Sequence, residues 1–552
     1  MREKGKVLLF ALSLITVCFA DNPVIQTCYT ADPAPMVYNG RVYLYVGHDS
    51  SAAPANSYLM RYWKCYSSTD MVNWTDHGAV LYAKPTFSWC GGDANAAQVI
   101  HREGKFYYYI STGGPGGIAI GVGIADSPTG PFKDAIGKPL IINSQTTYAS
   151  HSWDDLDPTV FIDDNEQAYL YWGNNACYWV KLNKDMITTN GSINAIPLNS
   201  TAFGPDFEEA PWVYKRKSLY YLIYASGFPE CIRYSTSTSP SGPWTYKGQI
   251  QPTQPNGVSN TIHPGIIDFK ENSYYFYHNA SLPGGHSYKR SVCIEQFKYN
   301  TDGTIPAIPA TTGGVVKGVD NLNPYDTTQA ETICWASGVR TEVCSEGGID
   351  VDSIHNGDYI KVKGVDFGTG ASSFMARVAS AAAGGKIELR LDSQTGTLIG
   401  TCNVSTTGGW QKWATETCTI SGATGIHDLF LKFTGGSGLL FNFNWWKFDR
   451  QNVGVEMKQM ISNSSKFKLK VKKSSGKAIL ALTIPSFKLN EGDIKISLFD
   501  VSGRYVCTAV IKRSQNDNQQ VDIHFPVIKS GTYLVKLFLS NELISSDHFT
   551  IK

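Results

Sequence analysis

The sequence predicts an all-β protein: a five-bladed β-propeller, then a β-sandwich of the jelly-roll kind, then a second, C-terminal β-sandwich. Three observations support this prediction. A pattern of apolar strand, polar turn and Tyr-rich strand recurs five times in the first half of the chain, many short strands with Gly turns follow it, and the last part alternates strictly between apolar and polar residues. The chain of 552 residues is also too long for a single hydrophobic core, so several domains are expected.

The N-terminus, MREKGKVLLFALSLITVCFA, has the pattern of a secretory signal peptide. Three basic residues precede an apolar run over residues 7–19, and the small Ala20 offers a cleavage point. The run is shorter than the ~18–20 residues that a membrane span needs, and no later stretch is long and apolar enough. A lipid-modified Cys18 is an alternative that the bulky Val17 disfavours. We therefore expect removal of residues 1–20 and a secreted or cell-surface protein.

Residues 21–318 form the expected propeller. The repeat begins with YTADPAPMVYNGRVYLY, and its copies start roughly 50 to 65 residues apart, which is the pitch of a propeller blade. Four copies open with a titratable residue next to or near proline, and these residues are Asp32, Asp157, Glu209 and His263. Because the first strand of each blade lines the central channel, these side chains are expected to converge at one mouth of the channel.

Two further domains follow a linker rich in Pro, Gly and Thr over residues 301–324. Residues 325–449 contain many short strands with Gly turns, the pattern of a β-sandwich. Residues 451–552 alternate strictly, as in KFKLKVKK, and carry 15 Lys and Arg against 8 Asp and Glu. We interpret this basic charge as that of a solvated face of another β-sandwich.

Charge and cysteine content exclude several partners. The net charge of +1 favours neither nucleic acid nor an acidic membrane. Of the 12 cysteines, the six within the expected propeller lack the spacing of a metal site. Cys402 and Cys418 flank a short segment as two neighbouring strands would, and Cys334 with Cys344 is a second candidate pair for a disulfide in an oxidising compartment. The pairing stays open.

The blade-opening motifs resemble those of glycoside hydrolase family 43, five-bladed enzymes that act on arabinose- and xylose-containing plant polysaccharides. TADPAP, DLDPTVF, FEEAPWVYKR and NTIHPGIIDF occur in the family's order. QAETICWASGVRTE, NGDYIKVKGVDFG, STTGGWQKWAT and LFNFNWWKF are similar to carbohydrate-binding module family 6. ISLFDVSGRYV and SGTYLVKLFLS resemble the C-terminal sorting domain of the type IX secretion route in Bacteroidetes.

The resemblance implies three catalytic carboxyl groups. Hydrolysis with inversion needs one carboxylate to activate water and one carboxylic acid to protonate the departing oxygen. Asp32 matches the base, Glu209 the acid, and Asp157 a third carboxylate that raises the pKa of the acid and orients it. Glu208 is a rival acid, but adjacent residues of a strand point to opposite faces, and Glu209 is the one beside Ala-Pro. The three acids are expected at equivalent positions of three blades.

The resemblance also assigns residues to calcium and to substrate. His263 would lie on the channel axis, beside a calcium ion held largely by water. Arg290, in YKRSVC, matches a substrate-binding arginine whose paired donors would hold a sugar hydroxyl or Asp157. Glu331 resembles the ligand of a structural calcium in the binding module. No cofactor is expected to take part in the chemistry.

Sugar binding in the second domain needs an aromatic platform and an amide. By motif these are Trp410 or Trp413 and Asn442. The loop over residues 337–348, where the family often supplies a second aromatic residue, contains none, so we expect the usual cleft to be weak or displaced.

These assignments predict a secreted, monomeric, inverting α-L-arabinofuranosidase that releases arabinofuranosyl side chains from arabinoxylan-type hemicellulose. A β-xylosidase, or endo-acting cleavage of xylan or arabinan, is the alternative within the class, because loops around the channel decide the substrate. A carbohydrate-binding protein without catalysis is an alternative of another class, and the intact acid set argues against it. An adhesion protein, finally, would bind without releasing sugar.

Overall fold

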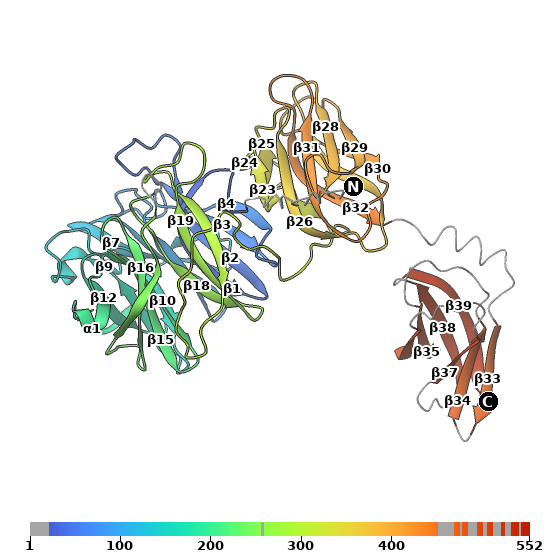
Figure 1. Cartoon of the computed structure of the whole chain (residues 1–552), viewed down its shortest axis with the longest axis horizontal. Helices are drawn as coiled ribbons and strands as arrows, with labels where there is room; N and C mark the ends of the chain where they lie inside the picture. The colour runs from blue at the N-terminus through green and yellow to red at the C-terminus, as the bar shows by residue number, and fades with distance from the viewer. Residues whose placement is uncertain are drawn as a thin grey trace, which may run out of the picture. The chain divides into compact units, whose positions relative to one another are not determined.

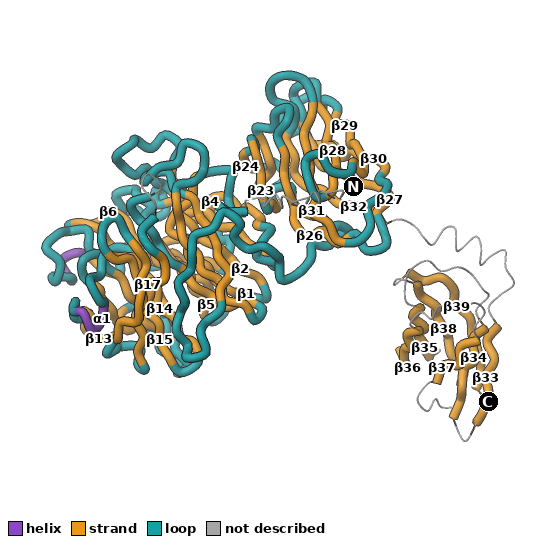
Figure 2. The backbone as a smooth tube through the Cα atoms, in the orientation of Figure 1, coloured by secondary structure: helices purple, strands orange, loops and turns teal. Residues whose placement is uncertain are grey.

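The computed structural model describes residues 21–254 and 259–450, together with strands of the C-terminal part within residues 468–551. The described chain is almost entirely β (Figure 1), and Figure 2 shows its two helical turns, η1 (Asn143–Gln145) and α1 (Ser200–Phe203). Among the described residues we find no helix with the length and hydrophobicity of a membrane span. The expected signal peptide lies outside the described residues.

Five antiparallel sheets follow one another between Tyr29 and Phe297 (Figure 1). The first contains β1 (Tyr29–Tyr38), β2 (Arg41–Asp49), β3 (Tyr62–Ser68) and β4 (Trp74–Tyr82). The second contains β5 (Ala97–Arg102), β6 (Lys105–Gly114), β7 (Gly117–Ala125) and β8 (Lys133–Asp134), with β9 (Ile141–Ile142) paired to β7. The third contains β10 (Thr159–Ile162), β11 (Ala168–Trp172), β12 (Cys177–Leu182) and β13 (Thr189–Ile196). The fourth contains β14 (Glu209–Arg216), β15 (Leu219–Ser226), β16 (Cys231–Ser237) and β17 (Thr245–Gln251), and the fifth β18 (Gly265–Phe269), β19 (Asn272–Asn279) and β20 (Ser291–Phe297).

The first strands of these sheets are neighbours in space. β1 contacts β5 and β18, and β10 contacts β5 and β14. The indole of Trp212 in β14 donates to the carbonyl oxygen of Ile266 in β18 at 3.1 Å, which completes the ring. The N-terminal segment lies along β20, where Val24 N–H donates to the Val292 carbonyl at 2.9 Å. The chain therefore brings the beginnings of β1, β10, β14 and β18 together.

The Tyr-rich second strands supply much of the core. Tyr45, Tyr108, Tyr221 and Tyr275 lie on the second strands of four sheets and belong to one buried cluster. Large aromatic side chains are suited to filling the space between twisted sheets, because each buries a large apolar area. The Tyr-rich strand that recurs in the sequence is thus the strand whose side chains pack between the sheets.

Residues 328–450 form two facing antiparallel sheets, as predicted for the binding module. One has the order β24 (Arg340–Val343), β25 (Ile349–Asp352), β32 (Asn442–Arg450), β27 (Ala371–Ala379) and β30 (Trp413–Thr419), with β21 (Thr328–Gln329) paired to β32. The other has the order β23 (Trp335–Ser337), β26 (Tyr359–Asp366), β31 (Ile426–Thr434), β28 (Gly385–Leu391) and β29 (Leu398–Val404). Phe374, Leu431 and Trp446 are fully buried in this module.

The module and the preceding sheets belong to one compact unit, residues 1–368 with 373–448. Strand β22 (Thr332–Ile333) leaves the module and pairs with β4. The buried ammonium of Lys361 in β26 lies 2.9 Å from a carboxylate oxygen of Asp21. A buried pair of this kind is costly to break, because it leaves one charge without a partner.

A second compact unit consists of residues 369–372 and 449–552. Its described strands form two antiparallel sheets, one with the order β33 (Lys468–Ser474), β34 (Lys477–Thr483) and β37 (Gln520–His524). The other has the order β36 (Tyr505–Ile511), β35 (Ile494–Asp500), β38 (Gly531–Leu539) and β39 (Glu542–Ile551).

The cysteines of the described residues are free thiols. Cys402 and Cys418 lie on β29 and β30 and are hydrogen-bonded to each other, so they are neighbours as predicted. Cys344 instead has Asp350 as its hydrogen-bond partner, and Cys334 lies near Lys361. The second candidate pair therefore has separate surroundings.

Candidate active site

Asp32 lies in a β-bulge of strand β1. The pairing with β2 jumps from Ala31–Gly47 to Ala34–Tyr45, so Asp32 and the proline after it have no partner residue. Asp32 has a φ of +52°, a left-handed conformation that is rare for residues other than glycine and is often found at functional sites. The bulge turns an aspartate out of an otherwise apolar strand.

Arg290 and His278 hold Asp32 in place. The Arg290 Nη1 atom donates to Asp32 Oδ1 at 2.8 Å, and the Asp32 backbone N–H donates to His278 Nδ1 at 3.2 Å. Arg290 is 3% exposed and binds Asp49 through both Nε, at 2.9 Å, and Nη2, at 3.0 Å. The expectation that Arg290 holds Asp157 by hydrogen bonds is wrong, because its guanidinium is committed to Asp32 and Asp49.

Asp157 connects the third sheet to the fourth. It precedes β10, has a φ of +59° and is followed by proline, as Asp32 is. Its Oδ2 atom accepts the backbone N–H of Ala210 at 3.0 Å, so Asp157 fixes the backbone directly after Glu209. Asp32 and Asp157 are therefore equivalent in conformation.

Glu209 is the first residue of β14, and its position differs from the prediction. The bulge in β14 lies between Glu209 and Trp212, and it is Ala210, with a φ of +55°, that precedes proline. Glu209 thus corresponds to Ala31, one residue before the position of Asp32, so the three acids are not at equivalent positions. The longer glutamate side chain starts from this earlier position, and its Oε2 atom accepts the Asn174 amide at 2.7 Å.

Glu208 has different neighbours from Glu209. Its hydrogen-bond partner is Asn175, and Asp206 and His151 are the charged or titratable groups near it. Glu209 instead faces Asn174 and Asp32. Glu208 precedes β14, and the two glutamate side chains have different hydrogen-bond partners, although the charge of Glu208 still acts on Glu209.

Burial sets the protonation of the three acids. Burial raises the pKa of Asp32 from 3.8 to about 6, although Arg290 opposes the shift. Burial also raises the pKa of Glu209, and burial together with the charge of Glu209 raises the pKa of Asp157 well above its usual value. Since Asp157 and Glu209 repel each other when both are ionised, the pair retains a proton more tightly than an isolated carboxyl group. The arginine beside Asp32 makes it the acid most suited to being ionised.

The sequence did not indicate several residues that support these acids. Asp49, Asn174 and His278 lie at or beyond strand ends outside the repeated opening motif, and Glu230 lies between β15 and β16. All four are buried, with exposures of 6% or less, although polar side chains are costly to bury without partners. Only the presence of an Asp or Glu among apolar residues, as in YLYVGHD, could have drawn attention to them.

His263 lies beside Asp32, with its Nδ1 atom 4.0 Å from Asp32 Oδ1. Burial lowers the pKa of His263 to about 3, so the ring is neutral and its nitrogen could bind a metal ion. Among the described residues, however, no group of three or more His, Cys, Asp and Glu side chains is arranged to hold a metal. A calcium ion here would depend mainly on water for its ligands.

Glu331 is buried where the module meets β4. Its Oε2 atom has no hydrogen-bond partner, and burial raises its pKa well above the usual value, with Asp76 and Asp350 as further negative neighbours. An unpartnered buried carboxylate oxygen is a suitable ligand for calcium. Backbone carbonyls or water would have to complete the shell.

The predicted sugar-binding residues of the module lie around the β24–β25 hairpin. Trp413 Nε1 donates to Ser345 Oγ at 3.0 Å, and Asn442 Nδ2 donates to Glu342 Oε1 at 2.7 Å. Gln411 donates to the same Glu342 oxygen at 2.9 Å. Trp410 and Trp413 are both partly exposed, so either can present a ring to a sugar. The loop without aromatic residues supplies polar groups beside Trp413.

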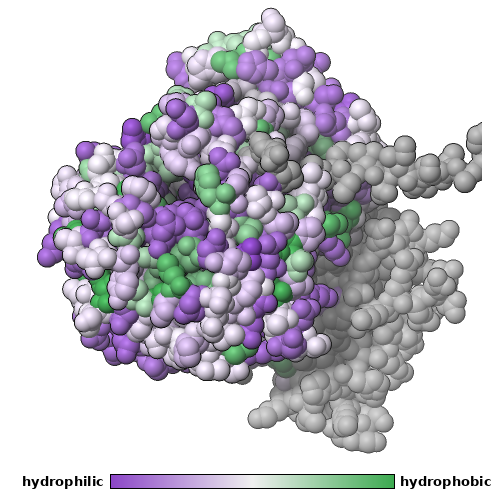
Figure 3. Space-filling model, turned by 60° about the vertical axis from the view of Figure 1, so that its left-hand side comes forward, coloured by the Kyte–Doolittle hydropathy of each residue, from purple (hydrophilic) through white to green (hydrophobic). Residues whose placement is uncertain are grey.

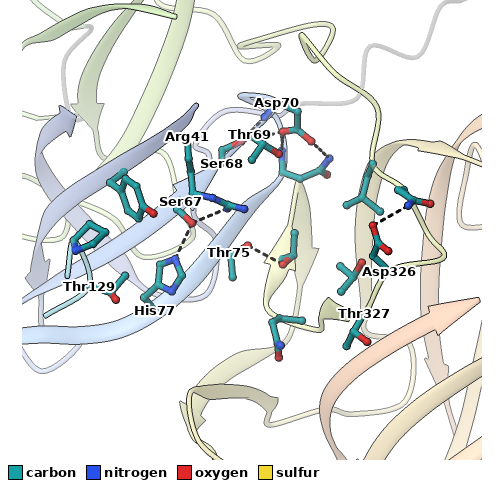
Figure 4. A pocket seen from close by; sticks show the side chains of 18 of the residues that line it. Arg41, Ser67, Ser68, Thr69, Asp70, Thr75, His77, Thr129, Asp326 and Thr327 are labelled. Carbon is teal, nitrogen blue, oxygen red and sulfur yellow. Dashed lines mark hydrogen bonds between the residues drawn. The ribbon is translucent and has the colours of Figure 1, made fainter. Parts of the chain in front are cut away.

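A polar cavity of about 550 Å³ lies elsewhere, between strands of the first sheet and the segment 321–332 (Figure 4). Arg41 donates to Ser67 Oγ at 3.0 Å, and His77 lies 2.7 Å from the same oxygen. Asp70 in its wall already accepts hydrogen bonds from Asn73 and from backbone amides. None of the three predicted catalytic acids lines this cavity, so it is not the catalytic centre.

The three carboxyl groups come together from separate sheets; one is paired with arginine and two favour protonation. Acid–base hydrolysis of a glycosidic bond requires such unequal carboxyl groups. The profile of Glycosyl hydrolases family 43 matches residues 20–305, and that of Carbohydrate binding module (family 6) matches residues 329–450. The chain belongs to glycoside hydrolase family 43 and carries a carbohydrate-binding module.

Relatives extend the comparison over most of the chain. An arabinoxylan arabinofuranohydrolase of Bacillus subtilis (strain 168) is 36% identical over 525 residues, which cover 82% of this chain and 100% of that protein. Another from Paenibacillus polymyxa is 35% identical over 488 residues, with coverage of 78% and 75%. The crystal structure of a family 43 arabinoxylan arabinofuranohydrolase from Bacillus subtilis, in complex with cellotetraose, is similar with a TM-score of 0.68 and 35% identity, and covers 78% of this chain and 98% of that one.

Proposed function

We propose that the protein is a secreted, inverting α-L-arabinofuranosidase that removes arabinofuranosyl side chains from arabinoxylan-type hemicellulose. The observation that carries the proposal is the convergence of Asp32, Asp157 and Glu209 from three sheets into one group with unequal environments, in which Asp32 and Asp157 are buried and Glu209 is partly exposed. Two relatives, similar to this chain over most of their length, are arabinoxylan arabinofuranohydrolases. We infer that the five sheets are the blades of a propeller, because their first strands neighbour one another in a ring.

Each acid has one role in the proposed reaction. Asp32, held as a carboxylate by Arg290, takes a proton from water while the water oxygen attacks the anomeric carbon. Glu209 gives its proton to the glycosidic oxygen as the bond to the xylan chain breaks. Asp157 fixes the backbone after Glu209 and, by repulsion, keeps the proton on Glu209. The products are arabinose of inverted anomeric configuration and a free hydroxyl on the xylan chain.

The remaining parts have supporting roles. We propose that the module binds the polysaccharide through Trp410 or Trp413 and Asn442, and that calcium near His263 and at Glu331 stabilises the structure without entering the chemistry. The C-terminal unit would direct the protein through type IX secretion after removal of residues 1–20. On the face seen in Figure 3, apolar residues lie in separate small groups among polar ones, which is consistent with a monomer.

Product analysis on arabinoxylan, arabinan and linear xylan, side by side, tests the proposal. We expect arabinose from arabinoxylan and an undegraded xylan backbone. Xylose from linear xylan would indicate a β-xylosidase, and shortened oligosaccharides would indicate endo-acting cleavage. Binding without any released sugar would support the non-catalytic alternative.

A further inference from the structure

A fourth carboxyl group, Glu230, lies against the predicted general acid. Glu230 directly precedes β16 and is 3% exposed. Its Oε2 atom accepts the backbone N–H of Ile262 at 2.7 Å, and its own backbone N–H donates to the Asn260 carbonyl at 2.9 Å. The carboxyl group is hydrogen-bonded to Glu209. Two carboxyl groups can share a hydrogen bond only when one of them carries a proton.

The surroundings identify Glu230 as the carboxyl that holds the shared proton. The other titratable groups facing the pair are the acids Asp32, Asp157 and Glu208, and Tyr58. The nearby cation, Arg290, is bound to Asp32 and Asp49. Burial and the charge of Glu209 raise the pKa of Glu230 well above its usual value. Each carboxyl group accepts one N–H donor, Glu209 from Asn174 and Glu230 from Ile262. Glu209 is the more exposed of the two, so its carboxylate is less costly to bury than that of Glu230.

We propose that Glu230 is a positioning residue of the reaction: it stays protonated and donates a hydrogen bond to Glu209. Together with Asn174 it fixes the plane of the Glu209 carboxyl group. When Glu209 gives its proton to the leaving oxygen, the O–H of Glu230 stabilises the new negative charge on Glu209. The hydrogen bond between the two side chains therefore strengthens as the reaction proceeds.

The same segment also supports the base. Thr261, next to Ile262, accepts at its carbonyl a hydrogen bond from His278 Nε2 at 3.0 Å. The other ring nitrogen of His278 accepts the Asp32 backbone N–H at 3.2 Å. Residues 260–262 therefore contact both Glu230, the partner of Glu209, and His278, the partner of Asp32. This explains why the acid and the base are held in one frame although they lie on different sheets.

Two substitutions test the proposal, which rests on the proposed role of Glu209 as general acid. In Glu230→Gln the amide can accept from Ile262 and donate to Glu209, as a protonated glutamate does. We expect this variant to keep kcat within about threefold, with its pH profile unmoved. Glu230→Ala removes the donor, and we expect kcat to fall about 10- to 100-fold with little change in KM.

The alkaline limb of the pH profile distinguishes this role from a merely structural one. Loss of the donor in Glu230→Ala disfavours the Glu209 carboxylate, so the pKa of Glu209 and the limb should move to higher pH. If Glu230 were ionised instead, Glu230→Gln would remove a negative charge and move the limb to lower pH. That shift, or equal damage from Gln and Ala, would overturn the proposal.

Infrared spectroscopy separates failure of this inference from failure of the proposed function. At mildly alkaline pH the wild-type protein should show the C=O band of a buried carboxylic acid that Glu230→Gln lacks. Absence of a difference would overturn the protonated state of Glu230 whatever the reaction is. Full activity of Glu209→Gln, with the band present, would instead overturn the role of Glu209 as general acid.

Discussion

The proposed acid, Glu209, and the proposed base, Asp32, differ in how each residue is held. Asp32 is fixed from two sides, by the Arg290 guanidinium and through its backbone N–H by His278. Glu209 is held by the Asn174 amide and by Glu230. Asp32 has a cation beside it, whereas Glu209 has only neutral donors or acids. The two carboxyl groups therefore differ in proton affinity, as acid–base catalysis requires.

Removal of either catalytic carboxyl group should abolish most activity. We expect Asp32→Ala and Glu209→Ala each to lower kcat/KM on arabinoxylan by about 10²- to 10⁴-fold, because each supplies one proton transfer. Glu208→Ala, the matched control, should lose less than about tenfold, since Glu208 faces Asn175. Circular dichroism checks that the variants fold. An inactive Glu208→Ala beside an active Glu209→Ala would reverse our assignment of the acid.

The pH profile should report the ionisation of Asp32. Because the base must be ionised, kcat/KM should rise with pH up to about 6, the pKa to which burial raises Asp32. Arg290→Gln removes a cation that lowers this pKa, so its acidic limb should move to higher pH. Rates on a soluble aryl arabinofuranoside measure both limbs. A wild-type limb near the ordinary aspartate pKa of ~3.9 would contradict the buried environment described for Asp32.

The sequence indicated which acids lie near one another where a motif belongs to the repeat. Asp32, Asp157 and Glu209 do come together, since each opens a sheet. The one-residue offset of Glu209 was not predictable, because the bulge that produces it depends on pairing with β15. Asp49 and Glu230 were missed, because nothing local distinguishes a buried acid with a distant partner from an exposed one.

At the scale of elements, bulges and hairpins place the functional groups. The bulges in β1 and β14 each contain a proline, which cannot donate to a strand partner, and each includes a residue with positive φ. In the module, the β24–β25 hairpin brings Ser345 and Glu342 to Trp413 and Asn442. Sequence patterns located these strands, but the polar contacts follow from the pairing of distant strands.

The module should bind polysaccharide independently of hydrolysis. We expect Trp413→Ala to weaken binding to soluble arabinoxylan about tenfold, because a sugar loses its stacking surface. Hydrolysis of an aryl arabinofuranoside should be unchanged. Affinity electrophoresis measures binding, and Trp410→Ala is the comparison variant. If neither variant weakens binding, the platform lies elsewhere in the module.

At the scale of the whole molecule, the first unit contains the complete candidate site. Strand β22 and the Lys361–Asp21 pair connect the module to the catalytic sheets, and no predicted catalytic residue belongs to the second unit. The sequence correctly predicted β structure in both units. It could not predict the attachment of the module, because Asp21 and Lys361 are separated by most of the chain.

The C-terminal unit should be dispensable for chemistry. A chain ending at Arg450 keeps β32 whole, and we expect its kcat/KM on arabinoxylan to equal that of the full chain. In the native host this shorter protein should fail to reach the cell exterior. Purified enzyme assays and cell fractionation measure the two outcomes. Loss of activity in the purified shorter protein would show that the second unit supports the site.

The central claim is that Asp32 activates water directly and Glu209 protonates the leaving oxygen, in one displacement. The most direct test of this claim is proton NMR of the sugar first released from an α-L-arabinofuranoside, recorded before the anomers re-equilibrate. The account predicts the β-anomer first, because water attacks from the face opposite the leaving group. Initial release of the α-anomer would contradict it, since a carboxylate would then act as nucleophile and Asp32 would not be a base toward water in a single step.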